Sequence, residues 1–126
     1  MTRPLILVFD DDLVEHPDFL GHLPARFVYR ANADQAVADV AEVRPDCVFM
    51  DFSMNARLSG AQATEQLRAV YAHGALPIVA ISSDTRLNRK IVMAGATQSV
   101  AKMALPDQFG HLLRYVIPGV IDQNPR

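Results

Sequence analysis

The chain has 126 residues, enough to bury a core and within the usual size range of a single domain. Hydrophobic residues make up 50% and charged residues 21%, the balance of an ordinary soluble globular protein rather than a disordered or fibrous one. The formal net charge of −2 provides no positive field for a phosphate backbone or an anionic membrane, so we expect neither nucleic acid nor membrane as a direct partner.

The first apolar run, residues 5–9, predicts a strand buried on both faces of a parallel sheet. It ends abruptly at three aspartates, Asp10 to Asp12. The segment 13–23 that follows predicts only a short helix, because a proline and a glycine interrupt it.

A weaker strand is expected over residues 27–29, followed by a helix with one buried apolar stripe. The stripe consists of Val37, Val40 and Ala41. The next strand, residues 47–50, ends at Asp51. It contains the single cysteine, Cys47, which we expect to be buried and inert, as suits a reducing cytoplasm.

The pattern then repeats twice more. A helix after Gly60 has a stripe made of Ala63, Leu67, Val70 and Tyr71. The apolar run 77–81 predicts a strand that ends at Ser82. The helix beyond it stops at Gly95, and its stripe is Leu87, Ile91 and Ala94.

The last strand is expected over residues 99–101, directly before Lys102. The last helix starts near Pro106, and its apolar face is Phe109, Leu112, Leu113 and Val116. We therefore expect one domain over residues 1–119 and a short C-terminal tail over residues 120–126.

This element order predicts an α/β fold: a flavodoxin-like (βα)5 doubly wound sheet of five parallel strands, in the order 2-1-3-4-5. Strands 1 and 3 are then neighbours, so Asp10, Asp11 and Asp51 approach one another. Two carboxylates ~4 Å apart repel by roughly 4 kcal/mol at an effective dielectric near 20, so a cation must offset them. Hard oxygen ligands favour Mg²⁺ as that cation.

A soft-metal site is not expected, because the histidines show no ligand spacing. They are His16, His22, His73 and His111, and we expect them at the surface.

Phosphoryl transfer needs a nucleophile, a divalent cation and groups that hold the equatorial oxygens. Asp51 can be the nucleophile. Ser82 can donate its hydroxyl to a phosphoryl oxygen, and Lys102 can supply an ammonium, since both follow strands of the same sheet.

Four segments in chain order carry a more specific signal. They are Phe9-Asp10-Asp11-Asp12, Met50-Asp51-Phe52-Ser53-Met54, Ala80-Ile81-Ser82-Ser83, and Gly95-Ala96 followed by Ala101-Lys102. In this order they resemble the pattern of response-regulator receiver domains over nearly the whole chain. The resemblance implies a Mg²⁺ site at Asp10, Asp11, Asp51 and the backbone carbonyl of Ser53, a phosphoacceptor at Asp51, a switch hydroxyl at Ser82 and a phosphate-contacting lysine at Lys102.

The resemblance also implies a function in two-component phosphorelay signalling in the cytoplasm. A histidine kinase or phosphotransfer protein would phosphorylate Asp51, and a downstream protein or effector domain would bind the face of helix 4, strand 5 and helix 5. The chain would not be a separate enzyme beyond its own phosphorylation and autodephosphorylation. The kinase, the pathway, and whether the domain stands alone or belongs to a longer regulator stay open.

Three positions depart from the family pattern. Met103 follows Lys102 where proline is usual, so a trans bond is expected there. Ser99 replaces the usual aromatic residue of strand 5, so the switch must be read out differently. Asn55 replaces a common proline in the loop before Gly60, which is one residue longer than usual.

Two other functions fit part of the same residues. One is an interaction module with this fold that no longer uses phosphorylation. The other is a phosphatase resembling the haloacid-dehalogenase family, with Asp10 as nucleophile, since Asp10-Asp11-Asp12-Leu13-Val14 matches the motif D-x-D-x-[TV]. Only Asp107 and Asp122 remain for the late acidic pair of that family, and both are poorly placed.

Several candidate residues also have a purely structural interpretation. Asp12 is expected to cap the first helix, and Ser83 or Asp84 the fourth. Gly60 and Gly95 are expected to serve backbone conformation rather than ligand contact.

Overall fold

The structure is a computed structural model, which describes residues 3–117. Its five strands form one parallel sheet in the order β2-β1-β3-β4-β5, so the predicted topology is confirmed. The strands are β1 (Leu5–Phe9), β2 (Arg26–Arg30), β3 (Cys47–Met50), β4 (Ile78–Ala80) and β5 (Gln98–Ser99). The predicted domain boundary at residue 119 and the tail 120–126 lie outside the described residues.

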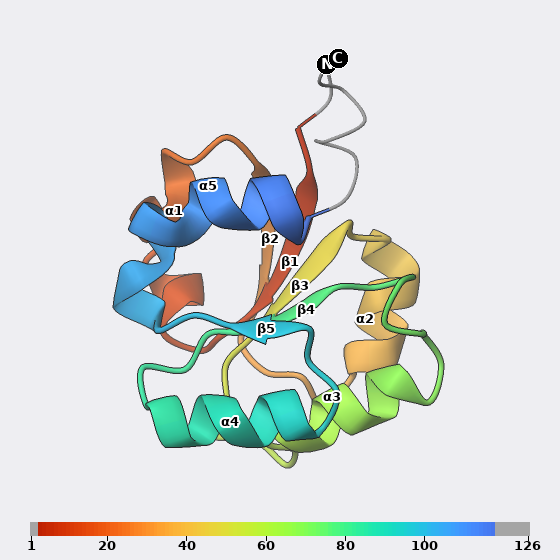
Figure 1. The fold of residues 1–126 in the computed structure, drawn as a ribbon. Coiled ribbons are helices and arrows are strands. Elements are labelled where there is room, and N and C mark those ends of the chain that lie inside the picture. The colour runs from red at the N-terminus through yellow and green to blue at the C-terminus, as the bar shows by residue number, and fades with distance from the viewer. Residues whose placement is uncertain (1–2, 118–126) are drawn as a thin grey trace.

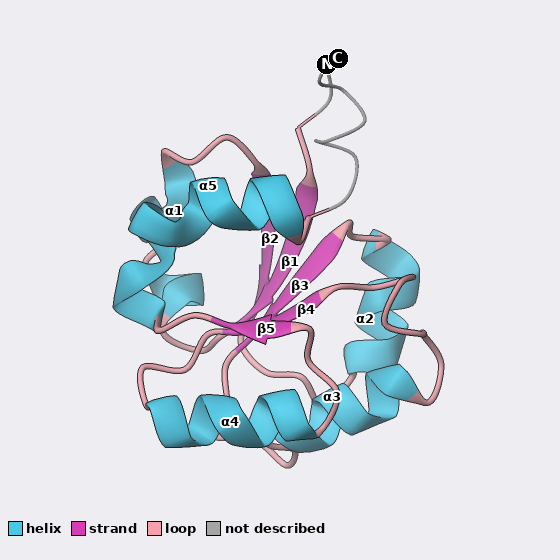
Figure 2. Cartoon of the chain, viewed as in Figure 1, coloured by secondary structure: helices cyan, strands magenta, loops and turns pink. Residues whose placement is uncertain are grey.

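Helices cover both faces of this sheet (Figure 1). They are α1 (Asp18–Gly21), α2 (Ala36–Val43), α3 (Gly60–Arg68), α4 (Thr85–Met93) and α5 (Leu105–Tyr115), with 3-10 turns η1 (Leu13–Glu15) and η2 (Lys102–Ala104). Figure 2 shows α1 and α5 on one side of the strands and α2, α3 and α4 on the other. Within residues 3–117, no helix has the length and apolar character needed to cross a membrane.

The core consists of two layers, one on each face of the sheet. Side chains alternate along β1, so Ile6 and Val8 pack toward α1 and α5, while Leu7 and Phe9 pack toward α2, α3 and α4. All four are fully buried, as is Cys47 in the neighbouring strand. This burial on both faces explains the unbroken apolar runs of the sequence.

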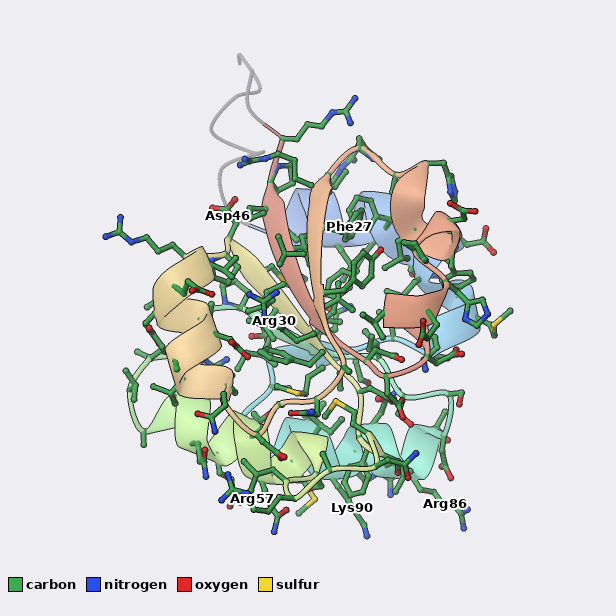
Figure 3. All side chains as sticks on the ribbon, turned by 180° about the vertical axis from the view of Figure 1, so that it is seen from behind. Phe27, Arg30, Asp46, Arg57, Arg86 and Lys90 are labelled. Carbon is green, nitrogen blue, oxygen red and sulfur yellow. The ribbon has the colours of Figure 1, made fainter. Side chains whose placement is uncertain are left out.

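The edge strand β2 is tied to the helix that follows it. Arg30 extends toward α2 (Figure 3), where its Nη2 lies 3.2 Å from Glu42 Oε1 and its Nε lies 3.5 Å from Asp39 Oδ1. These ion pairs connect α2 with the carboxyl end of β2.

The weakest elements differ from the prediction in their bounds. The first helix is a four-residue α1 after the turn η1, in line with the expected short helix. The last strand is Gln98–Ser99 instead of residues 99–101. Beyond it the Val100 amide still donates to Ala80 O at 2.8 Å, which extends the pairing by one residue.

For two residues, the prediction that they lie in the core is wrong. Val70 is 57% exposed, because α3 ends at Arg68 and the chain has left the helix at that point. Ala41 is exposed, while Ala36 and Val40 supply the buried side of α2.

Candidate functional site

Three acidic residues meet at the carboxyl edge of the sheet. Phe9 and Met50 are partners in the β1–β3 register, so the residues that follow these two strands become neighbours. One carboxylate oxygen each of Asp10, Asp11 and Asp51 lies within 4.8 Å of the other two. We call these three residues the acidic cluster.

Lys102 reaches the acidic cluster from the start of η2. Its Nζ lies 2.8 Å from Asp10 Oδ2 and 3.7 Å from Asp51 Oδ2. Burial by itself would lower the pKa of Lys102, but the bond to Asp10 and the charge of Asp51 outweigh burial and raise it. Lys102 therefore stays a cation at neutral pH beside the carboxylates.

Asp10 is fully buried and shapes the loop around the cluster. Its Oδ1 accepts hydrogen bonds from the amides of Asp12 at 2.8 Å and Leu13 at 2.9 Å. The prediction that Asp12 caps this turn is wrong, because Asp12 makes no side-chain cap bond and Asp10 binds the free amides instead.

The second oxygen of Asp10 shows that the cluster suits a cation. Within residues 3–117, the contact of the buried Oδ2 is with Lys102 Nζ at 2.8 Å, which leaves one of its two lone pairs free. A buried carboxylate oxygen with a free lone pair beside two further carboxylates is a donor set for a hard divalent ion such as Mg²⁺.

Asp51 lies at the centre of the cluster and is only 7% exposed. Burial and the charge of Asp10 raise the pKa of Asp51 to about 6, while Lys102 and the Phe52 amide act in the opposite direction. At pH above this value the carboxylate is ionised, as a nucleophile must be.

Ser82 lies at the same edge, immediately beyond β4. The amide of Ile81 still donates to Met50 O at 2.9 Å, which aligns the end of β4 with the end of β3. Ser82 is buried, and its Oγ accepts from the Asp84 amide at 3.1 Å. Within residues 3–117 this hydroxyl donates to no acceptor, so its one hydrogen is available for a ligand.

Asp84 rather than Ser83 caps α4. Its carboxylate accepts from the Arg86 amide at 2.8 Å, in agreement with one of the two predicted caps.

Ser53 and Asn55 are exposed in the loop between β3 and α3. Asn55 has a left-handed backbone (φ 49°). Asp34 holds this loop, since its carboxylate accepts from the amides of Leu58 at 2.9 Å and Arg57 at 3.3 Å. The sequence analysis missed Asp34, although an aspartate in an Asn-Ala-Asp turn after a strand is a typical acceptor for backbone amides.

Gly60 starts α3 against the backbone of Asp51. A Cβ at this position would lie 1.9 Å from the Asp51 carbonyl oxygen, so the close approach requires glycine. Ser59 and Gln62 form a capping box over the same first turn. Gly60 thus has the predicted structural role.

Asn88 is a second residue that the sequence analysis missed. It is buried on α4, its Oδ1 accepts from the Ser82 amide, and its Nδ2 donates to Ser82 O. An asparagine, a weak helix former, three residues before the buried Ile91 was the available signal.

The remaining predictions concern groups outside the cluster. The four histidines are exposed, as expected. The described residues contain no cis peptide bond, so the bond from Lys102 to Met103 is trans. Gly95 adopts φ +128°, a backbone role as predicted.

The family model of the response regulator receiver domain matches residues 23–114. The receiver domain of a sensor histidine kinase from Pseudomonas aeruginosa, solved with a magnesium ion coordinated in the active site cleft, is 24% identical with a TM-score of 0.75, over 90% of this chain and 96% of that chain. No curated protein matches the sequence.

Two further solved structures share the fold. The chemotaxis protein CheY4 of Vibrio cholerae is 20% identical with a TM-score of 0.72, over 92% of this chain and 100% of that chain. A putative response regulator from Chloroflexus aurantiacus is 19% identical with a TM-score of 0.74, over 90% of this chain and 96% of that chain.

Proposed function

The chain belongs to the family of response regulator receiver domains, and from this premise we propose that Asp51 accepts a phosphoryl group from a histidine kinase or a phosphotransfer protein in a Mg²⁺-dependent reaction. The domain, over residues 1–119 with residues 120–126 as a tail, then changes its binding to a downstream partner. It turns over no other substrate, beyond loss of its own phosphoryl group.

The observation that supports this proposal is the meeting of opposite charges around one nucleophile. Asp51 Oδ2 lies 3.7 Å from Lys102 Nζ, and its carboxylate shares a 4.8 Å cluster with Asp10 and Asp11. These groups come from β1, β3 and the segment after β5, so the fold has to form before they meet. We propose Asp10, Asp11, Asp51 and the Ser53 carbonyl as the metal ligands.

In the transfer step, an Asp51 oxygen forms a bond to phosphorus while the bond from phosphorus to the donor's leaving atom breaks. Lys102 is placed to hold one phosphoryl oxygen, and the free hydrogen of the Ser82 hydroxyl can be donated to another. A bound Mg²⁺ would neutralise charge on the phosphoryl oxygens and the carboxylates.

A groove beside Lys102 offers room for the phosphodonor. It has a volume of about 430 Å³, and its lining combines the apolar side chains of Leu13, Phe19 and Met103 with the polar residues Asp12, His16, Asp18 and Lys102. Its position between η1, α1 and η2 would let a protein donor approach the cluster from the side of the sheet that carries α1 and α5.

The output surface we propose is the face of α4, β5 and α5. Large apolar side chains are exposed there: Met93 on α4 at 82%, Met103 on η2 at 74% and Tyr115 on α5 at 67%. Exposed apolar side chains on adjacent elements are suited to a protein partner.

The phosphoacceptor proposal is tested by the intact mass of the protein after incubation with Mg²⁺ and acetyl phosphate. Wild-type protein is expected to gain the mass of one phosphoryl group. Asp51→Asn should gain none, because an amide is not a nucleophile for this transfer. Asp12→Asn, a change of an exposed aspartate in the adjacent loop, should label like wild type.

A labelled Asp51→Asn protein would refute the assignment of Asp51. If wild type is not labelled, the alternative function is favoured, an interaction module that does not use phosphorylation. The exposed Ser99 in place of an aromatic residue is the observation that favours this alternative. Hydrolysis of a phosphomonoester that survives Asp51→Asn and disappears in Asp10→Asn would favour the phosphatase.

A further inference from the structure

We propose that Asn88 is the positioning residue that ties Ser82 to α4, so that a phosphoryl group on Asp51 moves the α4 surface through the Asn88 amide. This inference rests on the proposed function and identifies the residue that couples the site to α4. It applies to a chain in which strand 5 carries an exposed serine, Ser99.

The backbone of Ser82 lies beyond the strand ladder and depends on a side chain for its partners. The last ladder bond on this side is from the Ile81 amide to Met50 O. The Ser82 amide donates to Asn88 Oδ1 at 2.7 Å, and Ser82 O accepts from Asn88 Nδ2 at 2.8 Å. Two short bonds to one planar amide fix both the distance and the orientation of Ser82 relative to α4.

The same amide also reaches the next strand segment. Asn88 Nδ2 lies 3.4 Å from Val100 O, two residues before Lys102. Asn88 therefore connects α4 with the segments that carry the hydroxyl and the ammonium. A ligand that pulls on either Ser82 or Lys102 acts on a backbone that this amide holds.

The attachment of α4 to the rest of the molecule makes this connection important. Among the nine residues of α4, the two buried side chains are Asn88 and Ile91. One of these two anchors is polar and is directed at Ser82. A displacement of Ser82 therefore changes the hydrogen bonds of one of the two buried side chains of α4.

A second contact joins α4 to the residue after the phosphoacceptor. Lys90 Nζ lies 5.8 Å from the centroid of the Phe52 ring, within cation–π range. Figure 3 shows Lys90 at the outer side of α4. The contact is exposed and weaker than the buried amide bonds, so we assign the main coupling to Asn88.

The alternative is that Asn88 only supports folding. A buried amide needs hydrogen-bond partners wherever it lies, and loss of these bonds would lower stability in either case. The two roles differ in what phosphorylation does to α4, so the test must measure the response of α4 and not stability alone.

The test compares wild type with Asn88→Ala by intact mass and by amide NMR, each with Mg²⁺ and acetyl phosphate. Wild-type protein is expected to label on Asp51 and to shift the amide resonances of residues 89–93. Asn88→Ala should still label, with these shifts reduced by about fivefold or more, because loss of even one hydrogen bond changes an equilibrium constant by about that factor and this variant loses both bonds to Ser82.

Ile91→Val is the matched control, because it removes a buried methyl group from the same helix and leaves the Ser82 bonds intact. It should label and shift like wild type. If Ile91→Val lost the shifts to the same extent, they would follow stability and the assignment to Asn88 would be overturned.

Full α4 shifts in labelled Asn88→Ala protein would overturn the inference and leave the phosphoacceptor proposal intact. Absence of labelling in wild type would instead refute the phosphoacceptor proposal itself. Should Asn88→Ala not fold, Asn88→Asp keeps an acceptor for the Ser82 amide and removes the donor; reduced shifts in it support the inference, and full shifts overturn it.

Discussion

Asp51 carries its charge in an unfavourable place. It is almost fully buried, and the carboxylate of Asp10 is a close neighbour, so without a bound ion its ionised form is destabilised and its pKa is raised to about 6. A site that repels its own negative charge in this way gains most in stability when a divalent cation binds beside the carboxylates.

The raised pKa of Asp51 predicts that the stability of the protein depends on pH in the absence of divalent ions. The folded protein keeps a proton on Asp51 between the ordinary value of 3.8 and about 6, where the unfolded chain has lost it. The contribution of this group is therefore present below pH 3.8 and is lost as the pH rises to about 6. Asp51→Asn has no carboxyl group to ionise here, so its stability should not fall over this pH range. At pH 8 it should be more stable than wild type by up to about 3 kcal/mol.

Urea unfolding of both proteins from pH 4 to pH 8 with a chelator measures this difference. The exposed Asp12→Asn variant is the control and should follow wild type. If Asp51→Asn and wild type had parallel stability curves over this range, the buried carboxylate would not carry the cost that we assign to it.

At the scale of elements, α3 begins in contact with the backbone of Asp51. Gly60→Ala places a methyl group against the Asp51 carbonyl, and we expect a loss of about 2 kcal/mol or more in the free energy of unfolding. Gly110→Ala in α5 is the matched control, since a Cβ there meets nothing within 4 Å.

The control should raise stability by roughly 0.5–1 kcal/mol, because alanine is the better helix former. Thermal or urea unfolding of both variants checks the pair. Equal effects of the two substitutions would show that α3 can move away from Asp51 without cost.

The elements also show what a sequence can predict. β1, β3 and β4 were identified because a strand buried on both faces leaves an unbroken apolar run. The predicted position of β5 differs from the observed one because this strand is only two residues long and Ser99 on it is exposed, so no apolar run marks it. Val70 was misplaced because α3 ends one turn before the apolar spacing does.

The residues of the acidic cluster were predictable because each lies within two residues of the end of β1 or β3, and strand order determines which ends meet. Asn88 and Asp34 were not predictable, because each bonds to backbone groups outside its own element, Asn88 to Ser82 and Asp34 to Leu58. Such a bond leaves a residue type in the sequence but no spacing that points to its partner.

At the scale of the whole molecule, the acidic cluster exists only in the folded chain. Asp11 and Asp51 are brought together by the pairing of β1 and β3, so Mg²⁺ should bind the folded state and not the unfolded chain. At a concentration 100 times its Kd, such an ion adds about 2.7 kcal/mol to stability.

We therefore expect Mg²⁺ to raise the Tm of wild type and to have little effect on Asp11→Asn. Asp11 is half-buried, and its replacement by an amide of the same shape should leave the fold intact. Thermal scans with and without Mg²⁺ at constant ionic strength check this. An equal rise in both proteins would place the ion elsewhere.

Because Cys47 is buried, the reactivity of its thiol measures how often the sheet opens. The sequence contains a single thiol, and it lies at 0% exposure in β3, next to the strand that carries Asp10. An alkylating reagent can reach it only when the centre of the sheet separates. The alkylation rate of the unmodified protein thus reports how often the sheet opens, and any ligand that holds β1 and β3 together should slow it.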